Sequence, residues 1–262
     1  MTDLFPRFAT AIRTADLTSI DRHTLIPAAF LLEQDGPYAV NYIPFEAVNR
    51  AARVVVVGLT PGFIQWRNGV AEAQRQLVAG ATQEAALLAA KRFGAFSGPL
   101  RPNLVALLDA IGLHEWLDVP SCAALFDTRP DLLHSTSILR HPVSRHGDNY
   151  SGMPAPISQP FLRRQIEQYF AQEAAQLAHA IFVPLGPAVA GGVRWLASQG
   201  VLSQDRILGG LPHPSGANAE RIAYFLGRKE RGTLSSRTDP VRLDLARQEL
   251  IRKVALLQGQ CR

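Results

Sequence analysis

Two short strings far apart in the chain carry the residue types that could do chemistry. The first is GLTPG (Gly58 to Gly62), which closes an apolar run that begins at Val54. Glycine and proline directly after a buried strand let backbone amides approach a ligand closely. The second is HPSGAN (His213 to Asn218), where a histidine in a Pro-Ser-Gly turn can aim a ring nitrogen into a cleft. Together they predict a site built from two turns.

Alternating apolar and amphipathic segments would position these turns. We predict strands at 53–59, 132–139, 180–185 and 206–211, and helices at 101–111, 161–178, 187–198 and 240–257, the last capped by Thr238 or Asp239. This order predicts an α/β fold, a three-layer α/β/α sandwich around a four-stranded, mostly parallel sheet. Ligands bind such sheets at the carboxyl ends of the strands, where both strings fall.

The length of 262 residues and a hydrophobic content of 47% suffice for one sizeable core, so we expect a single domain over residues 1–262. Residues 70–92 predict a helical insertion, either one kinked helix or two short ones, because Gly80 interrupts a stretch rich in Ala, Gln and Glu. Residues 141–160 predict a long loop of the kind that is usually functional or disordered.

The composition indicates neither a membrane protein nor a disulfide scaffold. The sequence has no run of about 18 apolar residues, so we expect a soluble, cytoplasmic protein. Cys122 and Cys261 lack the spacing of a zinc or iron–sulfur site and are expected to be free thiols. No motif predicts a metal ion.

Positive charge is concentrated at the C-terminal end. Residues 219–262 hold ten Lys and Arg against five Asp and Glu, an excess of five that equals the net charge of the whole chain. Neutralised phosphates supply most nonspecific nucleic-acid affinity, so this basic helical region would attract a polyanion. A solvated helix face would give the same pattern, and that alternative stays open.

Five strings in order resemble motifs of the uracil-DNA glycosylase superfamily. GLTPG is similar to the first turn of that superfamily, G-x-[DN]-P-[YG], and FSGPLRPNLVALLDAIGL (Phe96 to Leu113) to its Phe-x-Gly element and Leu-rich helix. HSTSILRHP (His134 to Pro142) resembles its second strand, PLGPAVAGGV (Pro184 to Val193) its Leu-Gly-x-x-Ala element, and HPSGAN its closing His-Pro-Ser motif. The resemblance spans about residues 53–228, and the combination is more specific than any one string.

The resemblance implies hydrolysis of the N-glycosidic bond of a pyrimidine flipped out of DNA, a reaction that needs no cofactor. The departing base gathers negative charge on O2, so a hydrogen-bond donor aimed there is the largest expected electrostatic contribution. Neutral His213 is the candidate donor, with a purely structural histidine as the alternative. Phe96 would stack on the base, or else serve as an ordinary core aromatic.

The resemblance also implies the remaining contacts. Substrate-binding candidates are Ser137, in the place of the base-reading Asn of the family, and the turn residues Gly58, Leu59, Pro61, Gly62 and Phe63. DNA-binding candidates are Ser215, Gly216, Ala217 and Asn218, which would enter the minor groove, with Arg221 near the flanking phosphates and Arg140 as a further DNA contact. A helix-capping role for Ser215 or Asn218 is equally compatible with the sequence.

Departures from the family pattern bear on water activation. Thr60 stands where many relatives carry an Asp or Asn that positions or activates the attacking water. A Thr hydroxyl can orient a water but has no useful basicity near neutral pH. We therefore include Asp148 as a catalytic candidate, with His146, Asn149 and Asp127 as further options, although each also fits a surface or turn position.

Two more departures widen the expected substrate range. Ser137 discriminates poorly between uracil and cytosine edges, because a hydroxyl both donates and accepts. Gly62 leaves room for a 5-substituent where the strictest uracil enzymes hold a Tyr.

The sequence therefore predicts a monofunctional DNA glycosylase that leaves an abasic site, in DNA repair or phage defence. Its base would be uracil or a 5-modified cytosine, such as a hydroxymethylated or glucosylated phage base. We expect a monomer that binds double- or single-stranded DNA and no membrane. The alternatives are a catalytically inactive DNA- or nucleobase-binding protein of the same fold, and an unrelated small-molecule enzyme on the same sandwich.

Overall fold

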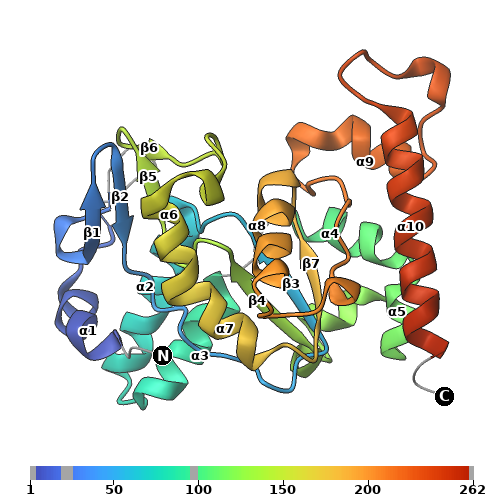
Figure 1. Cartoon of the computed structure of the whole chain (residues 1–262). Helices are drawn as coiled ribbons and strands as arrows, with labels where there is room; N and C mark the ends of the chain where they lie inside the picture. The colour runs from blue at the N-terminus through green and yellow to red at the C-terminus, as the bar shows by residue number, and fades with distance from the viewer. Residues whose placement is uncertain (1–3, 19–25, 95–99, 260–262) are drawn as a thin grey trace. The chain divides into compact units, whose positions relative to one another are not determined.

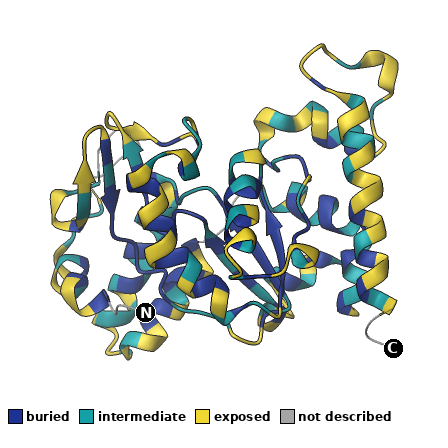
Figure 2. Cartoon of the chain, viewed as in Figure 1, coloured by how far each residue is buried: buried dark blue, intermediate teal, exposed yellow. Residues whose placement is uncertain are grey.

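Three short segments, two of them apolar, form a parallel sheet. In the computed structural model, which describes residues 4–18, 26–94 and 100–259, they are β3 (Val54–Gly58), β4 (Leu133–Ser137) and β7 (Ile181–Pro184), in the order β4-β3-β7 (Figure 1). β3 and β7 pair in register from Val54 opposite Ile181 to Val57 opposite Pro184. All residues of β3 and β7 are buried, as expected of strands covered on both faces (Figure 2).

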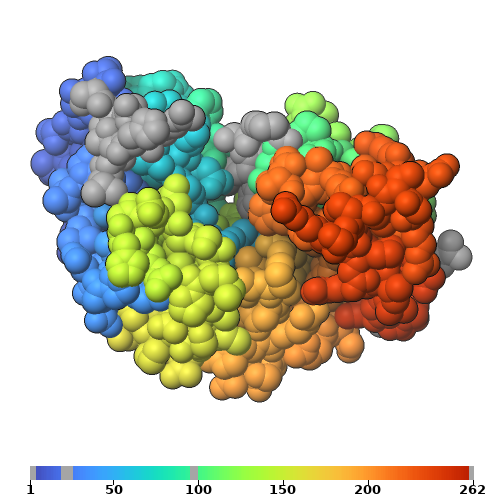
Figure 3. Space-filling view, turned by 90° about the horizontal axis from the view of Figure 1, so that it is seen from above, coloured from blue at the N-terminus to red at the C-terminus, as the bar shows by residue number. Residues whose placement is uncertain are grey.

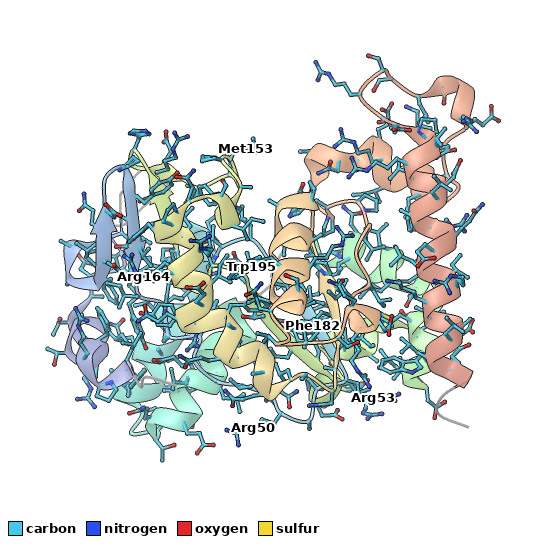
Figure 4. The ribbon with its side chains drawn as sticks, in the orientation of Figure 1. Arg50, Arg53, Met153, Arg164, Phe182 and Trp195 are labelled. Atoms are coloured by element: carbon cyan, nitrogen blue, oxygen red, sulfur yellow. The ribbon has the colours of Figure 1, made fainter. Side chains whose placement is uncertain are left out.

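The fourth predicted strand, 206–211, is reduced to one parallel bridge between Ile207 and Phe182, which Figure 4 labels on β7. The Leu208 amide donates to the Phe182 carbonyl oxygen at 2.8 Å, and the pairing then ends. Gly210 adopts a φ of 129° and Pro212 has no N–H, so the chain leaves the extended conformation there. The mixed α/β class is confirmed, with three strands and a bridge where four strands were expected.

A second, antiparallel sheet was not predicted. It comprises β1 (Leu31–Asp35), β2 (Tyr38–Asn41), β5 (Val143–Arg145) and β6 (Asp148–Asn149), in the order β1-β2-β5-β6. β5 and β6 are joined by His146 and Gly147, whose φ angles of 52° and 85° are those of a two-residue hairpin turn. The prediction of a loop over 141–160 is wrong for this part, because positive φ at His146 closes a hairpin.

The chain passes back and forth between two compact units. Unit 1 comprises residues 1–48, 58–97 and 135–176, and unit 2 comprises residues 49–57, 98–134 and 177–262. The single domain expected from the sequence stays a prediction.

Unit 1 contains α1 (Phe5–Thr14), α2 (Phe63–Val78), α3 (Gln83–Gly94), α6 (Pro160–Gln165) and α7 (Ala171–Gln176), the last two joined by a π-helical turn at Ile166–Phe170. The predicted insertion at 70–92 is two helices, separated at Gly80 (φ 78°), and α2 begins earlier than expected, directly after the first string. Trp66 of α2 lies in the aromatic core, where its indole N–H donates to the Tyr42 carbonyl oxygen at 3.0 Å. Arg164 of α6, labelled in Figure 4, forms an ion pair with Glu33 of β1.

Unit 2 contains α4 (Leu100–Asp109), α5 (Leu113–Leu117), α8 (Pro187–Ser198), α9 (Ala219–Phe225) and α10 (Pro240–Gly259). The predicted bounds of α8 are confirmed, and α10 extends two residues beyond its predicted end. Asp239 caps α10, because its carboxylate accepts the Arg242 amide at 3.1 Å, whereas Thr238 donates to Glu220. In Figure 3 the orange-to-red C-terminal residues form a broad surface. No helix within the described ranges has the length and apolar character needed to cross a membrane.

A buried network of charges joins three elements of unit 1. The Lys91 ammonium on α3 donates to Glu173 Oε1 on α7 at 2.9 Å and to the Ala47 carbonyl oxygen at 2.7 Å. Thr136 of β4 donates its hydroxyl to Glu173 Oε2 at 2.9 Å. Glu173 is only 1% exposed and Lys91 8%, so neither charge is solvated by bulk water. Burial lowers the pKa of Lys91, and the facing carboxylate partly offsets that effect.

We expect Glu173→Leu to lower the free energy of unfolding by about 3–5 kcal/mol, because it leaves the Lys91 charge buried without its carboxylate. Urea denaturation followed by circular dichroism measures this. The double variant Lys91→Met/Glu173→Leu should recover most of the loss, since two apolar side chains can replace a buried pair. Glu249→Gln, which removes the exposed pair with Arg252, is the control and should leave stability unchanged. If Glu173→Leu and Glu249→Gln lowered the free energy of unfolding equally, the buried pair would not be the stabilising contact inferred here.

Candidate functional site

The first string and the end of β4 lie side by side in unit 1. The Ile138 amide donates to the Gly58 carbonyl oxygen and the Leu139 amide to that of Leu59, both at 2.9 Å. This pairing continues the sheet past Ser137, the last residue of β4. Two of the five strings singled out by the sequence, one closing β3 and the other β4, are therefore brought together at the carboxyl ends of parallel strands.

Thr60 connects these two segments through its hydroxyl. The hydroxyl donates to the His141 carbonyl oxygen at 3.0 Å and accepts the Val143 amide at 3.0 Å. Its only proton is therefore used within the protein, and one acceptor lone pair remains. The geometry gives Thr60 a structural role, and its predicted part in orienting a water is limited to accepting a hydrogen bond.

A recess lies between this turn and the strand end. Its walls are Phe45, Pro61, Gln65, Lys91, Ser135, Thr136, Ser137 and Arg140, all in unit 1. Pro61, Ser137 and Arg140 were predicted site residues, and the structure brings these three together. The enclosed part has room for about one water-sized group, and the rest is open to solvent.

Gln65 is a wall residue that sequence reasoning missed. Its side-chain Oε1 accepts the Gly62 amide at 2.9 Å, which fixes the orientation of the carboxamide. Within the described ranges, Gln65 Nε2 has no hydrogen-bond partner. The signal was present in the sequence, because a Gln three residues after a helix-capping position often bonds back to the capping amide.

Phe45 forms the apolar side of the recess, and two glycines leave room for its ring. A Cβ on Gly69 would lie 2.7 Å from the Phe45 ring, and one on Gly94 would lie 2.6 Å from it. Both distances are too short for real contacts, so α2 and α3 need glycine at these positions to admit the ring.

The other predicted residues of unit 1 lie outside the recess, and Arg140 lines it without its predicted role. Phe63 belongs to the aromatic core and packs against Trp66, so packing explains this residue and its substrate-binding role finds no support. Arg140 was predicted to contact DNA. It is only 3% exposed and lines the recess, so its guanidinium is not available as a surface contact for phosphates. Asp148 is exposed on the β5-β6 hairpin. Phe96 lies outside the described residues.

In unit 2, His213 of the second string has a defined tautomer. Its Nδ1 accepts the Ser215 amide at 3.2 Å, so the proton of the neutral ring is on Nε2. Burial lowers the pKa of His213, which favours this neutral form at pH 7. The ring therefore presents Nε2–H as a donor.

The peptide between Pro214 and Ser215 is held at both ends. Its N–H donates to His213 Nδ1, and its carbonyl oxygen accepts Asn103 Nδ2 of α4 at 3.0 Å. Gly186, which follows β7 with a φ of 95°, lies against the ring, since a Cβ there would be 3.7 Å from His213 Cδ2. Asn103 was not predicted, because nothing in the helical pattern of 101–111 distinguishes it from a solvated polar residue.

The rest of the second string is tied together by side chains. Asn218 Nδ2 donates to Ser215 Oγ at 3.2 Å, and Arg221 donates to Asn218 Oδ1 at 2.7 Å and to the Arg237 carbonyl oxygen at 2.8 Å. Gly216 and Ala217 lie in the short turn between them. Ser215 and Asn218 occupy the N-cap positions of this turn and of α9, as the capping alternative expects, but neither side chain makes a capping hydrogen bond.

The predicted site residues thus form two groups. The GLTPG turn and Ser137 belong to unit 1, and His213 with its neighbours belongs to unit 2. Their convergence on one cavity stays a prediction. Within the described ranges, no three His, Cys, Asp or Glu side chains are grouped so that they could hold a metal ion.

Comparison with known proteins identifies a relative that covers most of the chain. The chain is 34% identical over 217 residues to YoxB, an uncharacterized protein of Bacillus subtilis (strain 168), and the match covers 82% of this chain and 85% of YoxB. The chain belongs to the same family as YoxB. No protein family model matches the chain, and no solved structure matches it. The relationship to YoxB covers most of the chain.

We expect Asn103→Leu to raise the pKa of His213 and to populate the second ring tautomer. Without Asn103 the Pro214–Ser215 peptide is free to rotate, and the N–H that opposes protonation of Nδ1 is lost. Nitrogen-15 NMR of the histidine rings across a pH titration measures both effects. Asn218→Ala, which removes a bond to Ser215 Oγ but not to the peptide, is the control. An unchanged tautomer in Asn103→Leu would show that the hydrogen bond from Asn103 to the Pro214 carbonyl oxygen does not fix the His213 ring.

Proposed function

We propose that this protein is a DNA glycosylase with the fold of the uracil-DNA glycosylase superfamily. Its substrate would be a flipped-out pyrimidine, either uracil or a 5-modified cytosine such as a hydroxymethylated or glucosylated phage base. In the reaction, the bond between N1 of the base and C1′ of the sugar breaks and its electron pair leaves with the base. A water oxygen then adds to C1′, the departed base takes up the proton that the water loses, and the product is an abasic site. The reaction would serve DNA repair or phage defence.

The observation that carries the proposal is the neutral His213 with its proton on Nε2. A leaving pyrimidine develops negative charge on O2, and a fixed neutral donor stabilises that charge without a proton transfer. The order of the five strings supports the same assignment, as does the adjacency of the GLTPG turn and the end of β4. The location expected from the sequence, the cytoplasm, is part of the proposal.

His213→Ala should reduce the rate of base release by about 100- to 1,000-fold, the usual effect of removing one oxyanion donor. The assay uses oligonucleotides with uracil, 5-hydroxymethylcytosine or glucosylated 5-hydroxymethylcytosine, followed by alkaline cleavage at abasic sites. His114→Ala, on α5, is the matched control and should leave the rate unchanged. Absence of strand scission by the wild-type protein on all substrates would refute the proposed function.

DNA would be held in part by the basic C-terminal region. Several of its cations are already paired: Lys229 with Glu220, Arg231 with Asp244 and Arg252 with Glu249. Four exposed arginines have no ion-pair partner within the described part of the chain: Arg228, Arg237, Arg242 and Arg247. Arg242 and Arg247 both lie on α10. Because neither has an ion-pair partner in the described part of the chain, both can contact phosphates without breaking an internal pair.

We expect Arg242→Gln/Arg247→Gln to weaken DNA binding for every sequence tested and to lower the slope of log affinity against log salt by about two. Fluorescence anisotropy at several salt concentrations measures both. Arg252→Gln is the matched control, because its guanidinium is already neutralised by Glu249 and its loss should change the slope less. An unchanged slope in the double variant would place the DNA elsewhere.

One observation favours the alternative of a catalytically inactive DNA- or nucleobase-binding protein. The Thr60 hydroxyl donates its proton to the His141 carbonyl oxygen, and no carboxylate replaces it in the GLTPG turn. A protein of this kind would bind DNA in a salt-dependent way, His213→Ala would not change that binding, and the wild type would release no base.

A further inference from the structure

The recess in unit 1 has a polar wall that the resemblance does not account for. Gln65 lies there three residues after Gly62, and its Oε1 accepts the Gly62 amide. Because Oε1 is occupied, the NH2 group of the carboxamide is the part that remains for a ligand. The hydroxyls of Ser135 and Ser137 line the same space and can also donate. The recess is therefore suited to a group that accepts hydrogen bonds.

Charge balance indicates that this group is uncharged. The two cations in the wall, Lys91 and Arg140, are accompanied by two carboxylates, Glu173 and Glu46, that act on Lys91. Lys91 already donates to Glu173 and to the Ala47 carbonyl oxygen. An added anion would face a cluster whose charges already cancel, whereas a neutral oxygen needs only the donors of Gln65 and the serines.

The size of the recess further limits the chemical group that it can bind. The enclosed part of the recess admits about one water-sized group, and Phe45 closes its apolar side. A Cβ on Gly62 would meet no atom within 4 Å, so the space beside this residue is open. A single oxygen atom on a short arm fits the enclosed part, and anything attached beyond that oxygen would have to lie in the open part.

We propose that the recess reads the oxygen of a CH2–O group on C5 of the pyrimidine, with Gln65 as the specificity-determining donor. This inference rests on the proposed function, and on the expectation that position 62 faces C5. A hydroxyl and a glycosidic ether both present an acceptor at that oxygen, so the free and the glucosylated hydroxymethyl bases share the feature. A 5-methyl group fills the same volume but leaves the Gln65 donor unpaired.

The test compares base release from oligonucleotides that carry uracil, 5-methylcytosine, 5-hydroxymethylcytosine or its glucosylated form. Wild type should prefer the CH2–O bases over 5-methylcytosine by about tenfold or more in kcat/KM, the worth of one good hydrogen bond. Gln65→Glu keeps the acceptor for the Gly62 amide but replaces the donor with a carboxylate oxygen. It should abolish that preference, by slowing release of the CH2–O bases more than release of 5-methylcytosine. Gln172→Glu, the same change at an exposed position of α7, is the control.

The outcomes separate this inference from the proposed function. If uracil is released but hydroxymethyl and methyl bases are treated equally, or if Gln65→Glu slows all bases alike, the recess does not read the oxygen. If the wild type releases no base, the proposed enzymatic function is refuted. Competition binding with the same oligonucleotides then tests whether the recess recognises the CH2–O oxygen. Preferential binding of the CH2–O bases that is lost in Gln65→Glu would support it, and equal binding would overturn it.

Discussion

The ion pair between Lys91 and Glu173 is the constraint on which the rest of unit 1 depends. Two charges removed from water are tolerated only when each meets its partner and the remaining hydrogen bonds are made. Here Thr136 of β4 and the Ala47 carbonyl oxygen complete the set. The network thereby fixes α3 and α7 against the strand whose last residue is Ser137. Moving this wall of the recess would expose or isolate a buried charge.

A comparable arrangement of smaller scale operates in unit 2. The Pro214–Ser215 peptide is held through its carbonyl oxygen by Asn103 and uses its N–H to set the tautomer of His213. Neither contact is strong alone, but one rigid peptide plane transmits the position of α4 to the imidazole. A donor that must act on developing charge gains from such preorganisation, because it needs no reorientation when the charge appears.

The parts of this structure that follow from local pattern were predictable from the sequence. β3, β7 and α8 were found within a residue or two, because continuous apolar runs and an amphipathic repeat are strong signals. The antiparallel sheet was missed, since β5 and β6 are very short and their turn depends on positive φ at His146. The segment 206–211 reads as a strand by composition, yet Gly210 and Pro212 limit it to one bridge. Local propensity does not reveal where a partner strand ends.

In the candidate site, too, local pattern predicted some residues, and contacts between distant segments determined others. Motif order singled out Pro61, Ser137 and His213, but it gave no role to Gln65, Lys91 or Asn103, because their importance comes from contacts between distant segments. Lys91 carried a partial signal as a charge on the buried face of an otherwise apolar helix pattern. Conversely, Thr60 and Phe63 were assigned chemistry by position in a motif, while their contacts show a hydroxyl tied to the backbone and a ring in the core. Resemblance locates a turn, whereas hydrogen-bond partners determine which of its groups remain available to a ligand.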